Sequence, residues 1–335
     1  MKSFLFNSTV LVEPTNICNL KCIMCEAKCT TDKGVKAEYL KPEELDIMLG
    51  KLDGYISNVV FQGDCEPTLN PYLGELVKVA KKYTEHVSIV TNGLALTSKK
   101  IDELIECGVS WFAISIDSHI PEVYNNIRRN SNFEKLMENL DYLLKLKNTV
   151  YKNIKIVTHK IVFNNDSEEY LKDYIRYFYV NKGVDKVTFA PLVEEGSIEN
   201  KNWIITRNNI ENDLIKEGIN LSLKDFSNYP YMSINKYCGT NLFFLGHTGS
   251  FAPCGLHTKE NKVFGNLLTE SLEEIVNKDV FKEFHNYWLN NNFNNKVPHI
   301  CENCYLLRSP YFSYCIDVPY EKKEEIDSCN LIGVL

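Results

Sequence analysis

Three cysteines near the N-terminus are the residues best placed to do chemistry. Cys18, Cys22 and Cys25 have the spacing C-x3-C-x2-C, directly after the apolar run Ser8–Val12, which predicts a strand. Three thiolates on one short loop can hold three irons of a 4Fe–4S cube and leave the fourth iron open to a substrate or cofactor. The alternatives are buried thiols or a structural zinc site. Zinc usually takes four ligands from paired motifs, and here the nearest candidate for a fourth is Cys29, in a polar segment.

A second group of cysteines lies in the last third of the chain. It consists of Cys238, Cys254, Cys301 and Cys304. Among them we expect an apolar strand at Leu242–Leu245, a turn at Gly246–Gly249, a Gly-Asn-Leu segment at 265–267 and a helix from Ser271. Four cysteines that share a pocket would bind a fully ligated cluster, which suits electron transfer. A four-thiolate zinc ribbon is the alternative with the same spacing.

Composition excludes several classes of protein. The 335 residues are enough for one large core and one smaller core. A net charge of −7 with scattered basic residues disfavours nucleic acid as a partner, and no apolar run is as long as a membrane span. The N-terminal stretch 1–7 has too short an apolar segment for a signal peptide. The twelve cysteines therefore predict metal binding in a reducing cytoplasm rather than disulfides.

Strand and helix patterns alternate from the N-terminus to about residue 215. After the first strand, strands are predicted at 59–61, 87–91, 111–116, 154–162 and 186–190, and helices at 71–83, 98–107, 133–146 and 168–179. Such alternation requires parallel strands joined by right-handed crossovers. Six units predict an α/β fold, an open, partial (β/α)6 TIM-like barrel. Function is expected at the carboxyl ends of its strands, where the first cysteine loop lies.

With these features the chain resembles the radical S-adenosylmethionine (SAM) superfamily, and its second cysteine group resembles the SPASM/Twitch extension of that family. The resemblance covers about residues 8–308. It implies a barrel at 8–215, a small α+β cluster-binding domain at 225–310 and a C-terminal tail at 311–335. It also implies two 4Fe–4S clusters: a SAM-binding one at Cys18, Cys22 and Cys25, and an auxiliary one at Cys238, Cys254, Cys301 and Cys304. SAM would be cleaved to a 5′-deoxyadenosyl radical that abstracts a substrate hydrogen.

Several predicted strand ends resemble the SAM-binding positions of the family. The segment 62–67, Gln-Gly-Asp-Cys-Glu-Pro, is similar to the variant G-x-G-E-P, with Asp64-Cys65 inserted where the usual motif has its second glycine. Thr-Asn-Gly at 91–93 resembles the family's T-N-G. By this resemblance the SAM contacts are Gly63, Glu66, Asn92, Ser115, Asp117 and Arg128. From the residues alone these positions are also typical of polar turns, a helix N-cap and a surface charge.

The remaining cysteines have separate interpretations. Cys65, beside the predicted SAM site, is a possible hydrogen-atom donor to a substrate radical, as an epimerase would require, or else a plain loop thiol. Cys107, near the end of a predicted helix, is most simply a core thiol. Cys315 and Cys329 stay unassigned, because six cysteines in this half cannot form two four-thiolate clusters. This favours the single-cluster Twitch form, although the two could complete a second, partly open cluster.

The expected activity is that of a cytoplasmic radical SAM oxidoreductase of the dehydrogenase type. It would oxidise an alcohol of a small polar substrate such as a sugar or aminocyclitol, because a single auxiliary cluster resembles the aminocyclitol dehydrogenases. The first strand also begins within about ten residues, which leaves no room for a peptide-recognition domain. The alternatives are a maturase that crosslinks or epimerises a ribosomally made peptide, and an iron–sulfur electron carrier. Expected partners are a small-molecule or peptide substrate and a reductant such as flavodoxin or ferredoxin, without nucleic acid or membrane.

Overall fold

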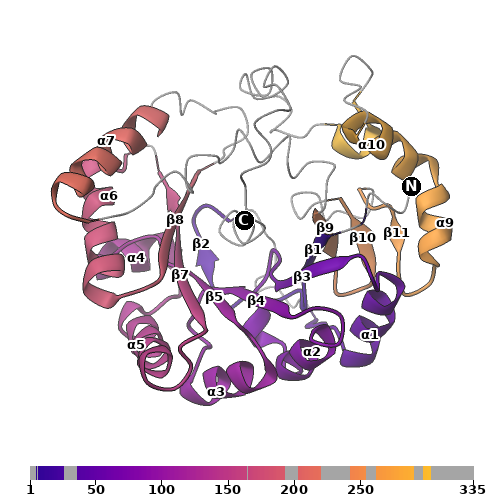
Figure 1. Ribbon diagram of the computed structural model, residues 1–335, viewed down its shortest axis with the longest axis horizontal. Coiled ribbons are helices and arrows are strands. Elements are labelled where there is room, and N and C mark those ends of the chain that lie inside the picture. The colour runs from indigo at the N-terminus through magenta and orange to yellow at the C-terminus, as the bar shows by residue number, and fades with distance from the viewer. Residues whose placement is uncertain are drawn as a thin grey trace.

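Six parallel strands form the wall of an open barrel (Figure 1). They are β1 (Ser8–Val12), β3 (Ile56–Phe61), β4 (His86–Thr91), β5 (Trp111–Ser115), β7 (Lys155–Val162) and β8 (Lys186–Pro191). Each strand pairs in parallel with the next.

The structure is a computed structural model that describes residues 5, 7–25, 36–163, 165–192, 203–219, 242–253, 262–289 and 297–302. The predicted partial (β/α)6 barrel is confirmed.

Helices cover the outer face of this sheet (Figure 1). They are α1 (Pro42–Lys51), α2 (Leu73–Ala80), α3 (Ser98–Cys107), α4 (Pro121–Ile127), α5 (Phe133–Thr149), α6 (Glu168–Ile175) and α7 (Trp203–Lys216). Local sequence sets their ends: the Thr97 hydroxyl accepts a hydrogen bond from the Lys100 N–H at the start of α3, and Gly108, with φ of 110°, ends that helix. Among the helices that the structure describes, none has the length and apolar character needed to cross a bilayer.

Alternate residues of each strand face either the helices or the barrel interior. Outward residues such as Val59 and Ile89 belong to the large core beneath the helices. The residues between them form a second, separate apolar cluster inside the barrel, which includes Leu11, Val60, Val90 and Ala113. Because side chains alternate along a strand, the next inward positions lie one layer higher, toward the carboxyl ends of the strands. These higher positions hold polar residues, and they include the candidate site.

The C-terminal half extends the barrel sheet. Strand β9 (Leu242–Leu245) pairs in parallel with β1, and β10 (Ser250–Ala252) and β11 (Gly265–Asn266) continue the sheet in antiparallel fashion. The predicted hairpin is confirmed, and its pairing with β1 is new. Helices α9 (Leu272–Asn277) and α10 (Asp279–Leu289) follow, and the ring of Phe264 packs edge-on against Phe281 and Phe284 of α10. The predicted domain boundaries stay a prediction, and the tail at 311–335 lies outside the described residues.

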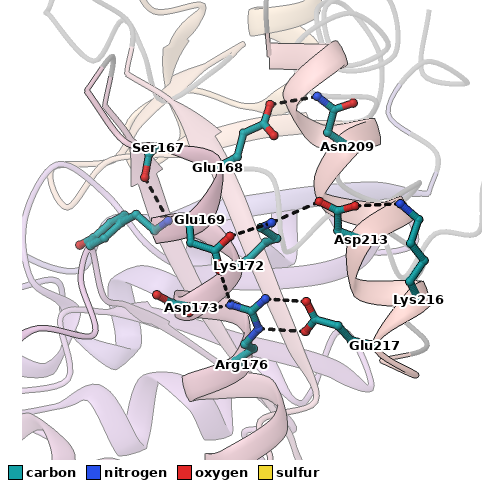
Figure 2. Close-up of polar contacts among 11 residues, drawn as sticks. Ser167, Glu168, Glu169, Lys172, Asp173, Arg176, Asn209, Asp213, Lys216 and Glu217 are labelled. Carbon is teal, nitrogen blue, oxygen red and sulfur yellow. Dashed lines mark hydrogen bonds and ion pairs between the residues drawn. The ribbon is translucent and has the colours of Figure 1, made fainter.

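Charged side chains join the last barrel helix, α7, to α6 and to the π-helical segment that follows α6 (Arg176–Lys182; Figure 2). The Arg176 guanidinium donates two hydrogen bonds to Glu217, at 3.0 Å from Nε and 2.6 Å from Nη2. Lys172 Nζ lies 3.2 Å from Asp213 Oδ2. These groups are partly exposed, so each pair contributes little stability by itself and mainly sets how the two helices align.

Candidate active site at the carboxyl ends of the barrel strands

The thiols of Cys18, Cys22 and Cys25 gather on the loop after β1. Burial, followed by the nearby charges of Glu66, Cys22 and Cys25, raises the pKa of Cys18 to about 12 although the Leu20 N–H opposes this. Burial also raises the pKa of Cys22, although Arg128 opposes it. Such thiols become thiolates when a cationic group binds them. Among the described residues no three His, Cys, Asp or Glu side chains converge on a point that suits one metal ion. The C-x3-C-x2-C spacing on one short loop fits a cube in which each cysteine holds a different iron.

The chain leading into the cysteine loop is fixed by side chains and backbone of two neighbouring segments. The carbonyl of Pro14 accepts hydrogen bonds from the Leu40 N–H at 2.9 Å and from Asn70 Nδ2 at 2.7 Å. The Thr15 hydroxyl donates to the carbonyl of Glu38 at 2.8 Å. Asn70 is fully buried, so its hydrogen bond to the Pro14 carbonyl is protected from water. The start of the loop is thus held by contacts within the protein.

Glu66 joins three loops at the site. Its Oε1 accepts hydrogen bonds from the Thr68 N–H (3.1 Å), the Thr68 hydroxyl (2.5 Å) and the Thr91 hydroxyl (2.5 Å). Its Oε2 accepts one from the Asn92 N–H at 2.8 Å, and its own N–H donates to the carbonyl of Ile17, next to Cys18, at 3.0 Å. The structure therefore brings the predicted site residues Glu66 and Asn92 together. It also gives Glu66, which is only 3% exposed, a structural role.

The Thr-Asn-Gly turn after β4 contacts the cysteine loop directly. Asn92 Nδ2 donates to Asn19 Oδ1 at 2.8 Å, and Asn92 Oδ1 accepts from the Leu94 N–H at 3.0 Å. Gly93 has φ of 79°, and a Cβ there would lie 2.5 Å from Leu136 Cδ1. Only glycine fits both conditions without strain. The turn is therefore built to place Asn92 against the loop.

A buried ion pair lies beside the cysteine thiols. β2 (Lys21–Cys22) pairs with β6 (Arg128–Arg129) so that Cys22 is opposite Arg128, and Arg128 Nη1 lies 4.0 Å from Cys22 Sγ. Arg128 Nε donates to Asp117 Oδ2 at 2.6 Å, while Asp117 Oδ1 accepts from the Ile161 N–H at 2.7 Å. Burial opposes the charge of Arg128, but Asp117 raises its pKa overall. Asp117 is fully buried and positions Arg128; the contacts of both residues with SAM stay predictions.

Replacement of Asp117 by Asn is expected to lower the free energy of unfolding by about 3 kcal/mol, because the buried Arg128 charge loses its counter-ion. Urea denaturation of the purified protein measures this. The control is Asp141→Asn, which removes the partly exposed Lys182–Asp141 pair, with its 2.7 Å distance, and should change stability little. Equal effects of the two substitutions would contradict the assignment of Asp117.

A polar row lies on the inner face of the barrel, above the apolar layer. Ser115 of β5 is in register with His159 of β7, and His159 with Thr188 of β8, so the three side chains share one face. The Thr188 hydroxyl donates to the carbonyl of Thr158 at 3.2 Å, so it accepts from His159 Nδ1 at 2.8 Å. Nδ1 therefore bears the hydrogen, and Nε2 is an acceptor. Burial lowers the pKa of His159 to about 4, so its ring is neutral at pH 7.

Next to Glu66, the Gly63–Asp64 turn packs against the barrel rim. Asp64 N–H donates to Glu13 Oε1 at 2.8 Å, and a Cβ on Gly63 would lie 2.5 Å from Glu13 Cγ. Glycine is therefore required for this close approach.

Cys65 is disulfide-bonded in the structure, and a disulfide sulfur has no hydrogen atom to donate. The predicted donor role would require reduced Cys65, and it stays a prediction.

The second cysteine group is only partly within the described residues. Cys301 lies in the 3₁₀ turn His299–Cys301, while Cys238, Cys254 and Cys304 lie outside the described residues, as do Cys29, Cys315 and Cys329. The auxiliary ligand set therefore stays a prediction. Cys107, at the end of α3, is only partly buried; it packs against the margin of the main core, and burial raises its pKa.

Sequence reasoning missed several residues of the site. They are Glu13, Asn19, Asn70, His159 and Thr188. The sequence did contain a signal for two of them, a polar residue at the carboxyl end of an apolar strand, where function was expected. Glu13 directly follows the first apolar strand, and His159 lies within the apolar run 154–162. Asn19 and Asn70 gave no such signal, because their partners are far away in the sequence.

Comparison with protein families agrees with this geometry. Residues 12–178 match the model of the Radical SAM superfamily, and residues 237–305 match that of SPASM, an iron-sulfur cluster-binding domain. The first match includes the cysteine loop, the Glu66 junction and the Arg128 ion pair. The second begins just before Cys238 and ends just after Cys304.

Individual relatives act on different substrates. The chain is 32% identical to the GTP 3′,8-cyclase of Chlorobaculum tepidum over 138 residues, 40% of each protein. It is 26% identical to the tungsten-containing aldehyde ferredoxin oxidoreductase cofactor-modifying protein of Pyrococcus furiosus, over 82% of each.

Solved structures share the fold at lower identity. anSMEcpe with bound AdoMet matches with a TM-score of 0.65 at 21% identity, over 90% of this chain and 87% of that one. Streptococcus suis SuiB bound to S-adenosylmethionine matches with a TM-score of 0.66 at 14% identity, over 90% of this chain and 72% of that one. BtrN in complex with AdoMet and 2-DOIA gives 0.51 at 16% identity, over 89% and 92%.

Proposed function

Because this chain belongs to the radical SAM superfamily and has a C-terminal SPASM iron–sulfur domain, we propose that it oxidises an alcohol group of a small polar substrate. Sugars and aminocyclitols are the substrate class that we favour. The family assignment brings SAM and two 4Fe–4S clusters as cofactors. When bound, SAM and its cluster supply a 5′-deoxyadenosyl radical that takes a hydrogen atom, and the auxiliary cluster supplies an acceptor for one electron.

We assign the SAM-binding cluster to Cys18, Cys22 and Cys25. Glu66 holds this loop at the Ile17 carbonyl, and the strand pairing with Arg128 holds it at Cys22. The guanidinium beside Cys22 offsets the negative charge of sulfur ligands. Cys301 would join Cys238, Cys254 and Cys304 at the auxiliary cluster, and a flavodoxin or ferredoxin would be the reductant.

The observation that supports alcohol oxidation best is the polar row inside the barrel. Removal of two hydrogens from an alcohol releases one hydrogen atom from carbon, then one proton from oxygen and one electron. In this proposal His159 Nε2 would accept the hydroxyl hydrogen, because the contact with Thr188 leaves Nε2 as the acceptor nitrogen of the ring. Ser115, in register with His159, adds a second hydroxyl for substrate recognition. An apolar substrate would leave these groups unpaired.

The function is tested by anaerobic turnover of the reconstituted enzyme with SAM, dithionite and a panel of sugars and aminocyclitols deuterated at carbinol carbons. We expect one deuterium in 5′-deoxyadenosine and a product that has lost that deuterium from carbon and one protium from oxygen. His159→Asn keeps a donor toward Thr188 but removes the Nε2 acceptor, and it should lower turnover about a hundredfold. An unlabelled substrate that returns from deuterated water as an epimer carrying one solvent deuterium would refute dehydrogenation and favour an epimerase that uses reduced Cys65.

Peptide maturation is the second candidate. We keep it because the fold also matches that of SuiB, whose complex with precursor peptide SuiA gives a TM-score of 0.56, and that of anSMEcpe with a bound Cp18Cys peptide, which gives 0.64. Both are under 25% identical to this chain, so they bear on fold alone. A crosslinked or epimerised peptide, with no turnover of any alcohol in the panel, would establish this candidate over the first.

A further inference from the structure

His247, in the turn of the β9–β10 hairpin, contacts the predicted SAM-binding end of the barrel. The Glu13 N–H donates to the carbonyl of Leu245 at 2.8 Å, so the pairing of β1 with β9 continues past the end of β1. His247 follows two residues later, in the turn before β10. It lies between Glu13, at the carboxyl end of β1, and Glu38, in the segment that precedes α1.

Glu13 in turn supports the Gly63–Asp64 turn. Its carboxylate is buried; Oε1 accepts the Asp64 N–H at 2.8 Å, and the side chain packs directly on the Gly63 backbone. A buried carboxylate needs a countercharge. Among the described residues, His247 is the cationic group at ion-pair distance from Glu13, with Nδ1 3.4 Å from Oε2. That nitrogen is buried, so its contact with the Glu13 carboxylate is shielded from water.

The surroundings of His247 favour an imidazolium. Its Nε2 lies 3.3 Å from Glu38 Oε2, so each ring nitrogen faces a carboxylate. Both nitrogens of an imidazolium bear hydrogens, which suits this arrangement. Burial lowers the pKa of His247, but Glu13 and Glu38 together outweigh it and raise that pKa overall. Glu13 from the end of β1 and Glu38 from the segment before α1 are the charged groups that face the ring within the described part of the chain.

We propose that His247 is a positioning residue for SAM: its imidazolium holds Glu13, and Glu13 holds the Gly63–Asp64 turn against the cofactor. The proposal rests on the SAM site proposed above, and it makes the C-terminal hairpin part of that site. Since the pKa of His247 is raised, the support is present at lower pH and is lost as the pH rises through that pKa. SAM should therefore bind more weakly in alkaline solution.

The test measures the Kd of SAM for the reconstituted full-length holoenzyme, anaerobically, at about pH 6 and about pH 9, which bracket the titration of a histidine. For the wild type we expect the Kd to rise about fivefold between these values, a typical coupling between linked groups. His247→Gln should show the weaker affinity at both pH values. His247→Lys keeps the positive charge and should bind SAM tightly at both.

Glu13→Gln supplies the decisive background, because its amide can still accept from the Asp64 N–H without needing a countercharge. In that background His247→Gln should cost no further SAM affinity, so the double-mutant cycle is strongly non-additive. Iron content and unfolding temperature are measured for every variant. A wild-type Kd for His247→Gln at low pH, additive effects, or iron loss in proportion to SAM loss would each overturn the proposal. A wild type that binds no SAM at any pH would instead refute the proposed function itself.

Discussion

Replacement of Cys18, Cys22 and Cys25 together by alanine is expected to remove about half of the iron and to abolish SAM cleavage. Two 4Fe–4S clusters give about eight irons per chain, and these three thiols would hold one cluster. Their loop is anchored by residues other than the cysteines, among them Asn70 and Glu66, so the variant should still fold. Iron and sulfide assays after anaerobic reconstitution, with chromatography of 5′-deoxyadenosine, measure the two effects.

Cys107→Ala is the matched control, because this thiol packs against the core away from the cysteine loop. It should retain all of the iron and the SAM cleavage of the wild type. A triple variant with a full complement of iron would place the first cluster elsewhere. A triple variant that loses all iron would show instead that the two halves of the protein cannot bind their clusters separately.

Glu66→Ala is expected to weaken SAM binding and also to destabilise the fold, by about 3 kcal/mol, because several buried donors lose their acceptor. The sequence resemblance predicted Glu66 as a SAM contact, a role that by itself would leave the stability of the fold nearly unchanged. The hydrogen bonds of Glu66 to Thr68, Thr91 and Asn92 change that expectation. Urea unfolding and anaerobic SAM titration measure the two effects separately.

Glu66→Gln separates the cofactor role from the structural one. The amide keeps one acceptor oxygen of nearly the same shape, so more of the stability should remain than in Glu66→Ala. It loses the negative charge, which should lower SAM affinity about tenfold, the scale of a charge-assisted hydrogen bond. A Glu66→Gln variant with unchanged SAM affinity would limit Glu66 to a structural role.

Local sequence signals predicted much of the barrel. The helix at Ser98–Cys107 was predicted to the residue, because Thr97 and Gly108 are strong start and stop signals. The strand at Leu242–Leu245 was also predicted correctly from a continuous apolar run. The helix α1 was missed although Pro42 and two glutamates mark its first turn. These features depend on neighbours in the sequence, which is why a single chain is enough to find them.

Long-range pairings were beyond that kind of reasoning. Nothing in the local pattern of Leu242–Leu245 indicates that it pairs with Ser8–Val12, more than two hundred residues away. For the same reason the Asn19–Asn92 contact was not predicted, although both motifs were noted separately. Asp117 was placed correctly at a strand end, but its pairing with Arg128 depends on the loop between them.

The most direct test of the central assignment is electron paramagnetic resonance of the dithionite-reduced protein with and without SAM. If Cys18, Cys22 and Cys25 hold a cluster with an open iron, SAM should change the signal of that cluster in the wild type. The signal that remains in the triple alanine variant should be that of the auxiliary cluster and should not respond to SAM. A wild-type spectrum that SAM leaves unchanged, or a SAM-dependent change that persists in the triple variant, would contradict the assignment.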